Sequence, residues 1–161
     1  MDIRSTGPED RPWIRDWLTE HFASPRIVSR GVLHQADALP GLAATEAGTP
    51  IGLLLHDRRG DECEVVVLIA GREGRGVATA LLAAAGRMAA AAGCRRLWLT
   101  TTNDNAAAIA FYERRGWRRC AIRHGAMIEA RKLKPELPAL GQGGVPVTDE
   151  IEFELRLSPP A

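Results

Sequence analysis

The chain has 161 residues, of which 45% are hydrophobic and 25% are charged, and its formal net charge at pH 7 is +1. This length suits one domain with its own core, so we expect a single domain over residues 1–161. The nearly balanced charge gives no electrostatic reason to expect binding to nucleic acid or to a membrane surface. The apolar stretch 81–93 is interrupted by Arg87 and glycines, so it predicts no membrane span, and no signal-peptide pattern precedes the first structured segment.

Cysteine and histidine usage argues against a metal site and against a disulfide framework. The three cysteines, Cys63, Cys94 and Cys120, are odd in number and lack CxxC spacing. The four histidines show neither HxxxH nor HExxH spacing. We therefore expect buried, reduced thiols in a cytoplasmic protein without a metal.

The first elements in chain order are a short strand over 1–4 and a helix over 7–22, which starts with proline and acidic residues. Trp13 and Trp17 are four residues apart on that helix, so they share a face and are expected to pack in the core. Segment 24–41 has no clean hydrophobic period. It is predicted to be a loop or a broken helix.

The middle of the chain is predicted to be rich in strands. Two apolar runs within 42–59 flank the Gly-Thr-Pro of 48–50, which predicts a β-hairpin. The β-branched run 62–70 predicts a strand. A glycine-rich loop then leads into a helix over 76–92, which Gly93 would end.

The last third alternates strands and helices. A helix over 104–116 has Asn or Asp available as its cap and Gly116 as its stop. The remaining predicted elements are strands over 95–101, 117–122 and 151–157, a short helix over 127–134, and a Pro- and Gly-rich loop over 135–150. The whole order predicts an α+β, three-layer fold with a mixed, mostly antiparallel sheet flanked by helices.

The glycine-rich loop has the properties of a phosphate cradle. Gly71, Gly74 and Gly76 come directly after a predicted strand and before a helix, with Arg72 and Arg75 among them. A helix start offers unpaired N–H groups and a positive dipole end, and glycine lets the backbone approach an anion closely. A plain flexible turn between strand and helix is the alternative.

Two common nucleotide motifs do not fit this loop. A P-loop needs Lys and Ser or Thr where Val77 and Ala78 stand, which argues against ATP or GTP hydrolysis. The dinucleotide motif needs a third glycine where Thr79 stands. The loop also follows a hairpin and not the first strand of repeated βαβ units, which disfavours a dinucleotide-binding protein.

Two motifs together point to a family. Residues 74–78 read Gly-Arg-Gly-Val-Ala, and residues 105–117 read N-x-x-A-x-x-x-Y-x-x-x-G-W. In this order they resemble the pyrophosphate-binding motif [QR]-x-x-G-x-[GA] and a later helix of the GNAT superfamily of acetyl-CoA-dependent N-acetyltransferases. Glu73 stands where the family usually has Gln or Arg. That departure leaves a cradle made of backbone N–H groups intact.

The resemblance implies a GNAT-like acyl-CoA N-acyltransferase fold and a function. The function is transfer of the acetyl group of acetyl-CoA to a primary amine by direct attack in a ternary complex, without a metal. The amine would belong to a small molecule or to a protein. The alternative is a non-catalytic module of the same fold that binds an acyl-CoA as a sensor. Dimerisation is common in this family, so a homodimer through the last strand or an exposed sheet edge is also open.

The resemblance also assigns residues to acetyl-CoA. Backbone groups near Leu68 and Ile69 would meet the pantetheine and the acetyl carbonyl, because this strand end splays from its neighbour in the family. Tyr112 would protonate the departing thiolate, and the alternative is a core tyrosine beside Phe111. Asn105 would cap its helix and contact CoA, and capping alone remains open. The expected pyrophosphate ligands are Gly74, Arg75, Gly76, Val77, Ala78 and Thr79.

The general base stays open between two residues. Glu62 and Glu64 are two apart on one strand, so they face the same side, either toward a cleft or toward solvent. A carboxylate in a partly dry cleft can accept a proton through water. His124 is a more distant candidate. Four residues in the segment after the first helix could bind a carboxylate-bearing acceptor or simply lie on the surface: Ser24, Arg26, Ser29 and Arg30.

Overall fold

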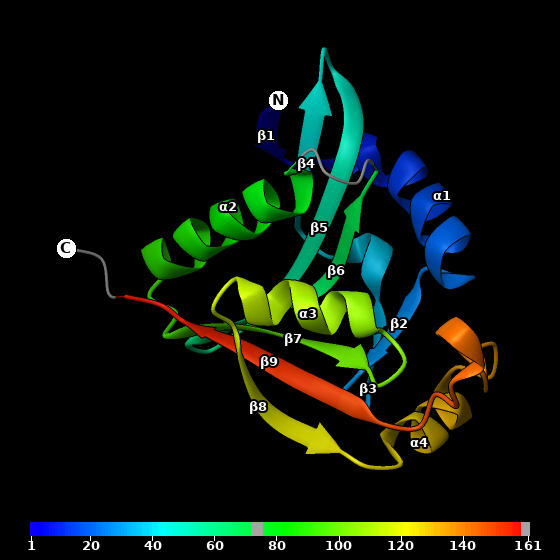
Figure 1. The fold of residues 1–161 in the computed structure, drawn as a ribbon. Coiled ribbons are helices and arrows are strands. Elements are labelled where there is room, and N and C mark those ends of the chain that lie inside the picture. The colour runs from blue at the N-terminus through cyan, green and yellow to red at the C-terminus, as the bar shows by residue number, and fades with distance from the viewer. Residues whose placement is uncertain (72–75, 159–161) are drawn as a thin grey trace.

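The structure is a computed structural model that describes residues 1–71 and 76–158 (Figure 1). Its strands are β1 (Asp2–Ser5), β2 (Arg26–Ser29), β3 (Val32–Gln35), β4 (Gly41–Glu46), β5 (Thr49–Arg59), β6 (Glu62–Ala70), β7 (Arg96–Thr102), β8 (Arg118–Arg123) and β9 (Glu150–Arg156). Its helices are α1 (Arg11–Phe22), α2 (Val77–Ala91), α3 (Ala106–Arg114) and α4 (Ala126–Leu133). Short 3₁₀ turns cover Pro8–Asp10, Ala36–Ala38 and Gln142–Gly144.

One mixed sheet organises the fold. Seven strands follow the order β1-β4-β5-β6-β7-β9-β8, while β2 and β3 form a separate hairpin. All neighbouring strands of the large sheet run antiparallel except β6 and β7, which are parallel and are joined through α2. These features confirm the predicted α+β architecture with a mostly antiparallel sheet flanked by helices.

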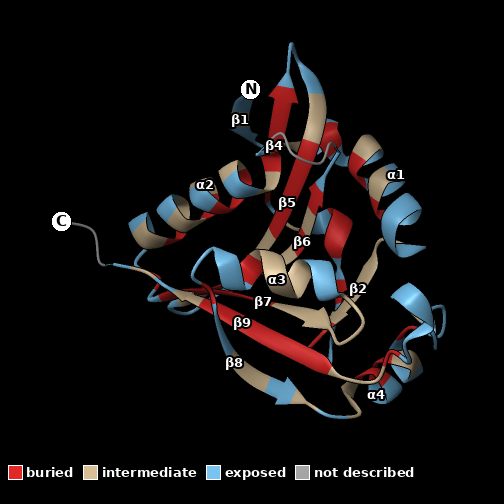
Figure 2. Ribbon diagram, viewed as in Figure 1, coloured by how far each residue is buried: buried red, intermediate tan, exposed pale blue. Residues whose placement is uncertain are grey.

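Each face of the sheet has its own hydrophobic cluster. On one face, Leu81 of α2 and Tyr112 of α3 belong to a cluster that includes Leu97 and Phe153 of the sheet. On the other face, α1 packs against Leu53, Leu55, Val67 and Ile69, among others. Figure 2 shows the buried residues running along the middle of β4, β5 and β9. The sheet is therefore covered on both faces, as a three-layer fold requires.

A glycine on β5 allows the start of α2 to approach the sheet. A Cβ built on Gly52 would lie 2.4 Å from Val77 Cγ1 and 3.0 Å from Leu81 Cδ1. Gly76 precedes the helix with a φ of +70° in the left-handed region, which glycine adopts without strain. These two glycines set where α2 begins above the end of β6.

Acidic side chains of β9 are buried beneath arginines. The side chains of Glu152 and Glu154 are 5% and 4% exposed. Arg96 of β7 bonds to both, at 2.9 and 2.8 Å. From β8, Arg123 reaches Glu152 at 2.7 Å and Arg118 reaches Glu154 at 2.6 Å. Buried charges need such pairing, so this ionic cluster holds β7, β9 and β8 in register.

The prediction for segment 24–41 was wrong, because residues 26–35 form the β2–β3 hairpin. The two strands are joined by Arg30 and Gly31, whose φ values are +50° and +75°. Two successive residues with positive φ are typical of a tight hairpin turn, and glycine in the second position favours it. Each strand has only four residues, which is too short for alternation to stand out in the sequence.

The other predicted strands and helices lie within a few residues of the observed ones. The predicted stops at Gly93 and Gly116 both fall on glycines with positive φ. Among the described residues, we find no helix with the length and apolar character that a membrane span requires. The same part of the chain contains no cluster of three or more His, Cys, Asp or Glu side chains that could hold a metal ion.

Candidate functional site

The parallel pair β6 and β7 opens into a V. Their ladder consists of three residue pairs, Glu62–Arg96, Cys63–Leu97 and Glu64–Trp98. On its other edge, β6 stays paired with β5 as far as Ala70, with an irregularity in register at Val66. The later part of β6, including Leu68 and Ile69, therefore has no strand partner on the side of β7. Unpaired backbone groups on this edge are available to a ligand, and we call this feature the β6–β7 opening.

The N-terminal end of α2 lies beside this opening. Gly76 provides no side-chain cap, and its carbonyl accepts a helical bond from Ala80 N–H at 2.9 Å. The N–H groups of the first turn thus lack intrahelical partners, as at every helix start. They belong to Val77, Ala78 and Thr79, whereas Gly74 and Arg75 of the expected cradle lie outside the described residues. An anion at this end is favoured by the N–H groups and by the helix dipole.

A cation from the end of α3 lies at the same place. Arg115, just beyond α3, donates from Nε to Thr79 Oγ1 at 2.9 Å and stacks on the Phe111 ring at 3.6 Å. The guanidinium thus joins the end of α3 to the start of α2. Its position adds positive charge to the expected phosphate cradle.

Asn105 and Tyr112, the two site residues predicted from the second motif, lie in different environments. Asn105 caps α3, since its Oδ1 accepts a hydrogen bond from Ala108 N–H at 3.2 Å. Tyr112 is 8% exposed and its ring lies 5.6 Å from the rings of both Trp117 and Phe153. Burial raises the pKa of Tyr112 to about 12. Its hydroxyl has no hydrogen-bond partner among the described residues, and it stays protonated at neutral pH.

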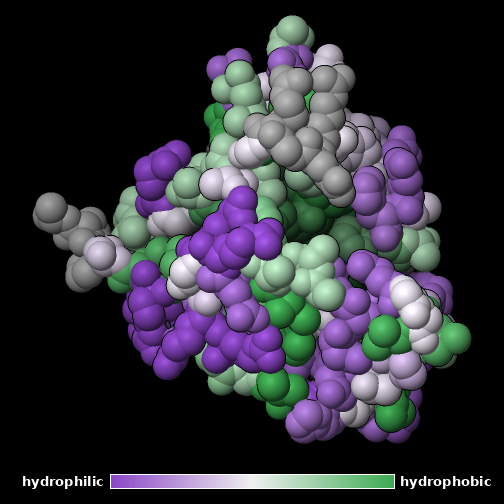
Figure 3. Space-filling view, viewed as in Figure 1, coloured by the Kyte–Doolittle hydropathy of each residue, from purple (hydrophilic) through white to green (hydrophobic). Residues whose placement is uncertain are grey.

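A cavity of about 260 Å³, here named the cleft cavity, lies along β7. Its wall includes Val66 at the irregularity of β6, the hydroxyl-bearing residues 100–102 of β7, Asn105 and Ser29. Apolar side chains from α1, the hairpin, α4 and the following segment complete it. In the space-filling view of Figure 3, a hollow with hydrophobic surface lies between α1 and α3. The cleft cavity could therefore hold a small ligand with polar and apolar parts.

The charged groups that line the cleft cavity are paired within the protein. Lys134 is 2% exposed, and its ammonium donates to the carbonyl of Phe22 at the end of α1, at 2.7 Å. Burial lowers the pKa of this lysine. Glu150 accepts a hydrogen bond from Arg123 at 3.2 Å. Ligand recognition in this cavity therefore depends mainly on hydroxyl groups and shape.

A second cavity, here named the hairpin cavity, lies between the β2–β3 hairpin and the sheet and also measures about 260 Å³. It is lined by Ser29, Arg30, Val32, His34, Asp57, Arg59, Glu62, Glu64 and Trp98. Both glutamates predicted as bases therefore lie on one side of β6, facing the same cavity. Ser29 lines the hairpin cavity and the cleft cavity alike.

The surroundings of the two glutamates differ. Glu62 accepts hydrogen bonds from Arg95 at 2.7 Å and from Arg96 at 2.9 Å. Glu64 is 5% exposed, and its Oε2 is buried without a hydrogen-bond partner among the described residues. Both hydrogen bonds to Glu62 come from arginines, whereas Glu64 has an oxygen open to a proton donor, so the geometry favours Glu64 as the base.

His34 was not among the candidate residues and lies beside Glu64. Its Nε2 is 3.5 Å from Glu64 Oε1, and its Nδ1 is 3.8 Å from Asp57 Oδ2. A hairpin prediction for segment 24–41 could have placed His34 over the sheet. His124, by contrast, has a side chain that is 81% exposed and pairs with Asp149.

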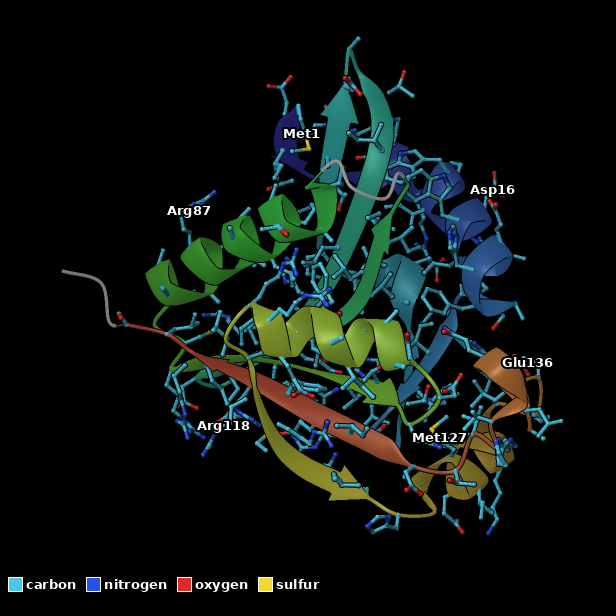
Figure 4. The ribbon with its side chains drawn as sticks, viewed as in Figure 1. Met1, Asp16, Arg87, Arg118, Met127 and Glu136 are labelled. Atoms are coloured by element: carbon cyan, nitrogen blue, oxygen red, sulfur yellow. The ribbon has the colours of Figure 1, made fainter. Side chains whose placement is uncertain are left out.

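The four expected acceptor-binding residues separate into two pairs. Ser24 and Arg26 both bond to Glu136, at 3.2 and 3.1 Å, on the segment beside the end of α1 (Figure 4). Ser29 lies 3.2 Å from the Thr100 hydroxyl, on the wall that the two cavities share. Arg30 stacks on the Trp98 ring at 4.7 Å, at the edge of the hairpin cavity. The geometry therefore brings Ser29 and Arg30 to the site and leaves the other two at the surface.

Comparison with known proteins identifies the class of protein. A family model described as the acetyltransferase (GNAT) family matches residues 6–117. The chain therefore belongs to the GNAT family of acetyltransferases. Over 141 residues it is 38% identical to the uncharacterized protein YdhI of Bacillus subtilis, covering 87% of this chain and 88% of YdhI. It is 32% identical over 152 residues to the uncharacterized protein YxbD of the same bacterium, covering 94% and 96%.

Solved structures share the fold. The ribosomal-protein-S18-alanine N-acetyltransferase of Escherichia coli has a TM-score of 0.69 at 21% identity, over 99% of this chain and 96% of that one. A GNAT family acetyltransferase of Elizabethkingia anophelis with acetyl-CoA bound has a TM-score of 0.69 at 17% identity, over 97% of both chains. At these identities the likeness concerns the fold. It confirms that the sheet and helices have the GNAT arrangement.

Proposed function

We propose that the protein is an acetyl-CoA-dependent N-acetyltransferase that acts on a primary amine by direct attack in a ternary complex. One observation carries the proposal. In a chain of the GNAT family, the β6–β7 opening lies next to the uncapped start of α2. A cofactor that carries phosphates and amides needs both features. Its phosphates need an anion site, and its amides need free backbone groups next to that site.

The expected position of acetyl-CoA follows from these features. The pyrophosphate would lie on the N–H groups of Val77, Ala78 and Thr79, with Arg115 as an additional cation nearby. The amide-containing arm would follow the unpaired edge of β6 past Ile69 and Leu68. A backbone N–H on this edge would stabilise the negative charge that develops on the thioester oxygen. The solved structure of the Elizabethkingia anophelis acetyltransferase, which has acetyl-CoA bound, supports acetyl-CoA as the ligand.

The acceptor amine would occupy the cleft cavity. This cavity borders Val66 at the inner part of the β6–β7 opening, so an amine there could approach the thioester carbon. Its volume of about 260 Å³ is at or below the lower end for sites that enclose drug-sized ligands. We therefore expect a small amine or the amino-bearing end of a longer molecule. A protein amine remains part of the proposal, since the Escherichia coli structural relative is named for a ribosomal-protein substrate.

Two side chains would carry the proton transfers. An ammonium acceptor loses one proton to Glu64, which frees the nitrogen lone pair. The nitrogen then bonds to the acetyl carbon while the carbon–sulfur bond breaks. Tyr112 donates a proton to the departing thiolate, and the second proton lost by the nitrogen restores the phenol through solvent. The products are the amide, the CoA thiol and one proton released overall.

A thiol-release assay with a panel of amines tests the proposal. Purified protein with acetyl-CoA is offered ethylamine, lysine, spermidine and a pentapeptide with a free N-terminal alanine, and the free thiol is measured with a chromogenic disulfide. At least one amine is expected to raise the thiol-release rate above that with acetyl-CoA alone. Tyr112→Phe, which removes only the phenolic oxygen, is expected to lower that rate. Acetyl-CoA binding without amine-dependent thiol release would instead favour the non-catalytic acyl-CoA sensor.

A further inference from the structure

The hairpin cavity has an unusually ionic wall. Six of its nine lining residues are ionisable: Arg30, His34, Asp57, Arg59, Glu62 and Glu64. A polar cavity of about 260 Å³ has room for several hydrogen-bonded waters. A cavity of this kind is suited to moving protons, because water and side chains together can form a continuous hydrogen-bonded path.

Most charges around the cavity neutralise one another. Arg59 bonds to Asp57 at 3.0 Å, and Glu62 is held by Arg95 and Arg96. Arg30 stacks on Trp98 and lies 3.6 Å from Glu152. These contacts account for the ionisable side chains in the wall of the hairpin cavity other than two buried ones, Glu64 and His34.

Glu64 and His34 lie beside each other. Both residues are at least 94% buried, and Glu64 Oε2 and His34 Nε2 have no hydrogen-bond partner within the described residues. The imidazole lies between two carboxylates, with Nε2 3.5 Å from Glu64 and Nδ1 3.8 Å from Asp57. Asp57 is the more accessible end, with 21% of its side chain exposed against 6% for Glu64. Unsatisfied buried polar atoms are costly, so their presence in a folded protein calls for an explanation.

The hairpin cavity is connected to the expected amine position by hydroxyl groups. Ser29 lines both cavities, and its Oγ lies 3.2 Å from Thr100 Oγ1 on β7. Each hydroxyl can accept one proton while it donates another. The shared wall therefore allows a proton to pass from the cleft cavity to Glu64.

We propose that Glu64, His34 and Asp57 form a proton relay that carries the proton of the acceptor ammonium from the cleft cavity to solvent. This inference rests on the proposed function. The ammonium gives its proton to Glu64 through the Ser29–Thr100 hydroxyls and cavity water. His34 takes it at Nε2, releases a proton from Nδ1 toward Asp57, and Asp57 passes it to water. Glu64 returns to the carboxylate form, and the amine is left neutral for attack.

Within this relay, Glu64 is the catalytic base, and His34 and Asp57 are positioning residues that act through it. The groups that face the pair are Arg30 from the hairpin turn, Asp57 and Arg59 from β5, Glu62 from β6, and Arg96 from β7 through Glu62. Because those other charges are already paired, removal of His34 takes from Glu64 the imidazole that lies beside it among the described residues. The structural alternative is that His34 only holds the hairpin onto the sheet.

Two nucleophiles separate these roles. Hydroxylamine is mostly neutral at pH 7 and needs no deprotonation before it attacks, whereas the fastest amine of the panel above is an ammonium at that pH. The variants His34→Gln, Asp57→Asn and Glu64→Gln are compared with wild type by thiol release from pH 6 to pH 9. His56→Gln is the matched control, because His56 has a buried, unpartnered Nδ1 but lies outside the hairpin cavity.

The relay predicts a loss that depends on the nucleophile. With the ammonium acceptor, His34→Gln should lower kcat/KM at pH 7 by about 10-fold or more, and Glu64→Gln by about 100-fold, within the range of general base catalysis. The loss should shrink toward pH 9 as free amine accumulates, while rates with hydroxylamine change by less than about 3-fold. Asp57→Asn, on the exposed end, should change the pH profile in the same direction without unfolding the protein.

Two results would overturn the proposal in distinguishable ways. Equal losses with both nucleophiles in His34→Gln and Asp57→Asn, or a loss no larger than in His56→Gln, would assign His34 a structural role and leave the acetyltransferase intact. If wild type gives no thiol release above the enzyme-free rate with any amine or with hydroxylamine, the proposed function is overturned and the relay with it.

Discussion

Loss of the Arg96 side chain is expected to lower the free energy of unfolding more than loss of any other side chain where β6 and β7 are paired. Its side chain is 10% exposed and bonds to Glu62, Glu152 and Glu154 at 2.9, 2.9 and 2.8 Å. Arg96→Met keeps most of the apolar volume and removes the charge. Breaking a buried ion pair by removing one partner costs about 3–5 kcal/mol. Because other arginines still contact all three carboxylates, we expect the lower end, about 3 kcal/mol at pH 7.

The size of this loss should depend on pH. Burial raises the pKa of Glu152, but hydrogen bonds from Arg123, Cys120 and Arg96 outweigh it and lower the pKa to about 2. A carboxyl group whose pKa is lowered in the folded state stabilises the fold above its ordinary pKa. That stability is lost as the pH falls from the ordinary value of 4.5 toward about 2. The difference between wild type and Arg96→Met should therefore narrow as the pH falls from about 4.5 toward about 2.

Urea denaturation at pH 7 and pH 3 measures this difference, and a neighbouring arginine provides the control. Arg95 also bonds to Glu62, at 2.7 Å, but its side chain is 52% exposed. Exposed ion pairs are worth about 0–1 kcal/mol, so Arg95→Met should change the free energy of unfolding by no more than that. The reasoning is refuted if the two variants lose equal stability at pH 7, or if the Arg96→Met deficit does not shrink in acid.

Further predictions concern the start of α2, the cap of α3 and the phenol. Gly52→Ala places a Cβ 2.4 Å from Val77 Cγ1, which should lower the free energy of unfolding by about 1–3 kcal/mol in urea denaturation. It should also weaken acetyl-CoA binding in a calorimetric titration. An unchanged affinity would mean that the start of α2 does not bind acetyl-CoA. Asn105→Ala removes the cap bond to Ala108 and should lower the free energy of unfolding by about 1 kcal/mol. If the binding free energy of acetyl-CoA falls by more than this, Asn105 also contacts the ligand. Tyr112→Phe should lower thiol release by about 10-fold or more with little change in melting temperature. Because burial raises the pKa of Tyr112 to about 12, its phenol keeps its proton up to pH 10, and an alkaline loss of wild-type rate that disappears in the phenylalanine variant would contradict this.

Long elements with agreeing local signals could be predicted from the sequence. The run 62–70 has three successive valines and an isoleucine and is observed as β6 with the same bounds. The helix predicted over 76–92 is observed as Val77–Ala91, since glycines with positive φ stand at both ends. In these segments, residue preference, periodicity and end signals all indicate the same structure.

The β2–β3 hairpin could not be predicted from local signals. Its strands are short, and Arg30 occupies a turn position with positive φ where Asn, Asp or Gly is usual. Glu150 of β9 accepts a hydrogen bond from the Arg30 N–H at 3.2 Å, which supports this conformation from 120 residues away. Missing the hairpin also meant missing His34 as a neighbour of Glu64.

The choice between the two glutamates likewise depends on distant residues. Glu62 and Glu64 are equivalent in the sequence pattern, because both alternate toward one side of a strand. The arginines that neutralise Glu62 are the first residue of β7 and the residue before it, more than thirty residues later, and the histidine beside Glu64 comes from β3. Only tertiary structure separates a paired carboxylate from one that can accept a proton.

The most direct test of the acetyltransferase account is a calorimetric titration of the purified protein with acetyl-CoA, with NAD and ATP as controls. The account predicts saturable binding of acetyl-CoA in the micromolar range, one molecule per chain, with much weaker binding of both control nucleotides. No heat of binding with acetyl-CoA, or equal binding of all three ligands, would contradict the assignment of the β6–β7 opening and the start of α2 as an acyl-CoA site.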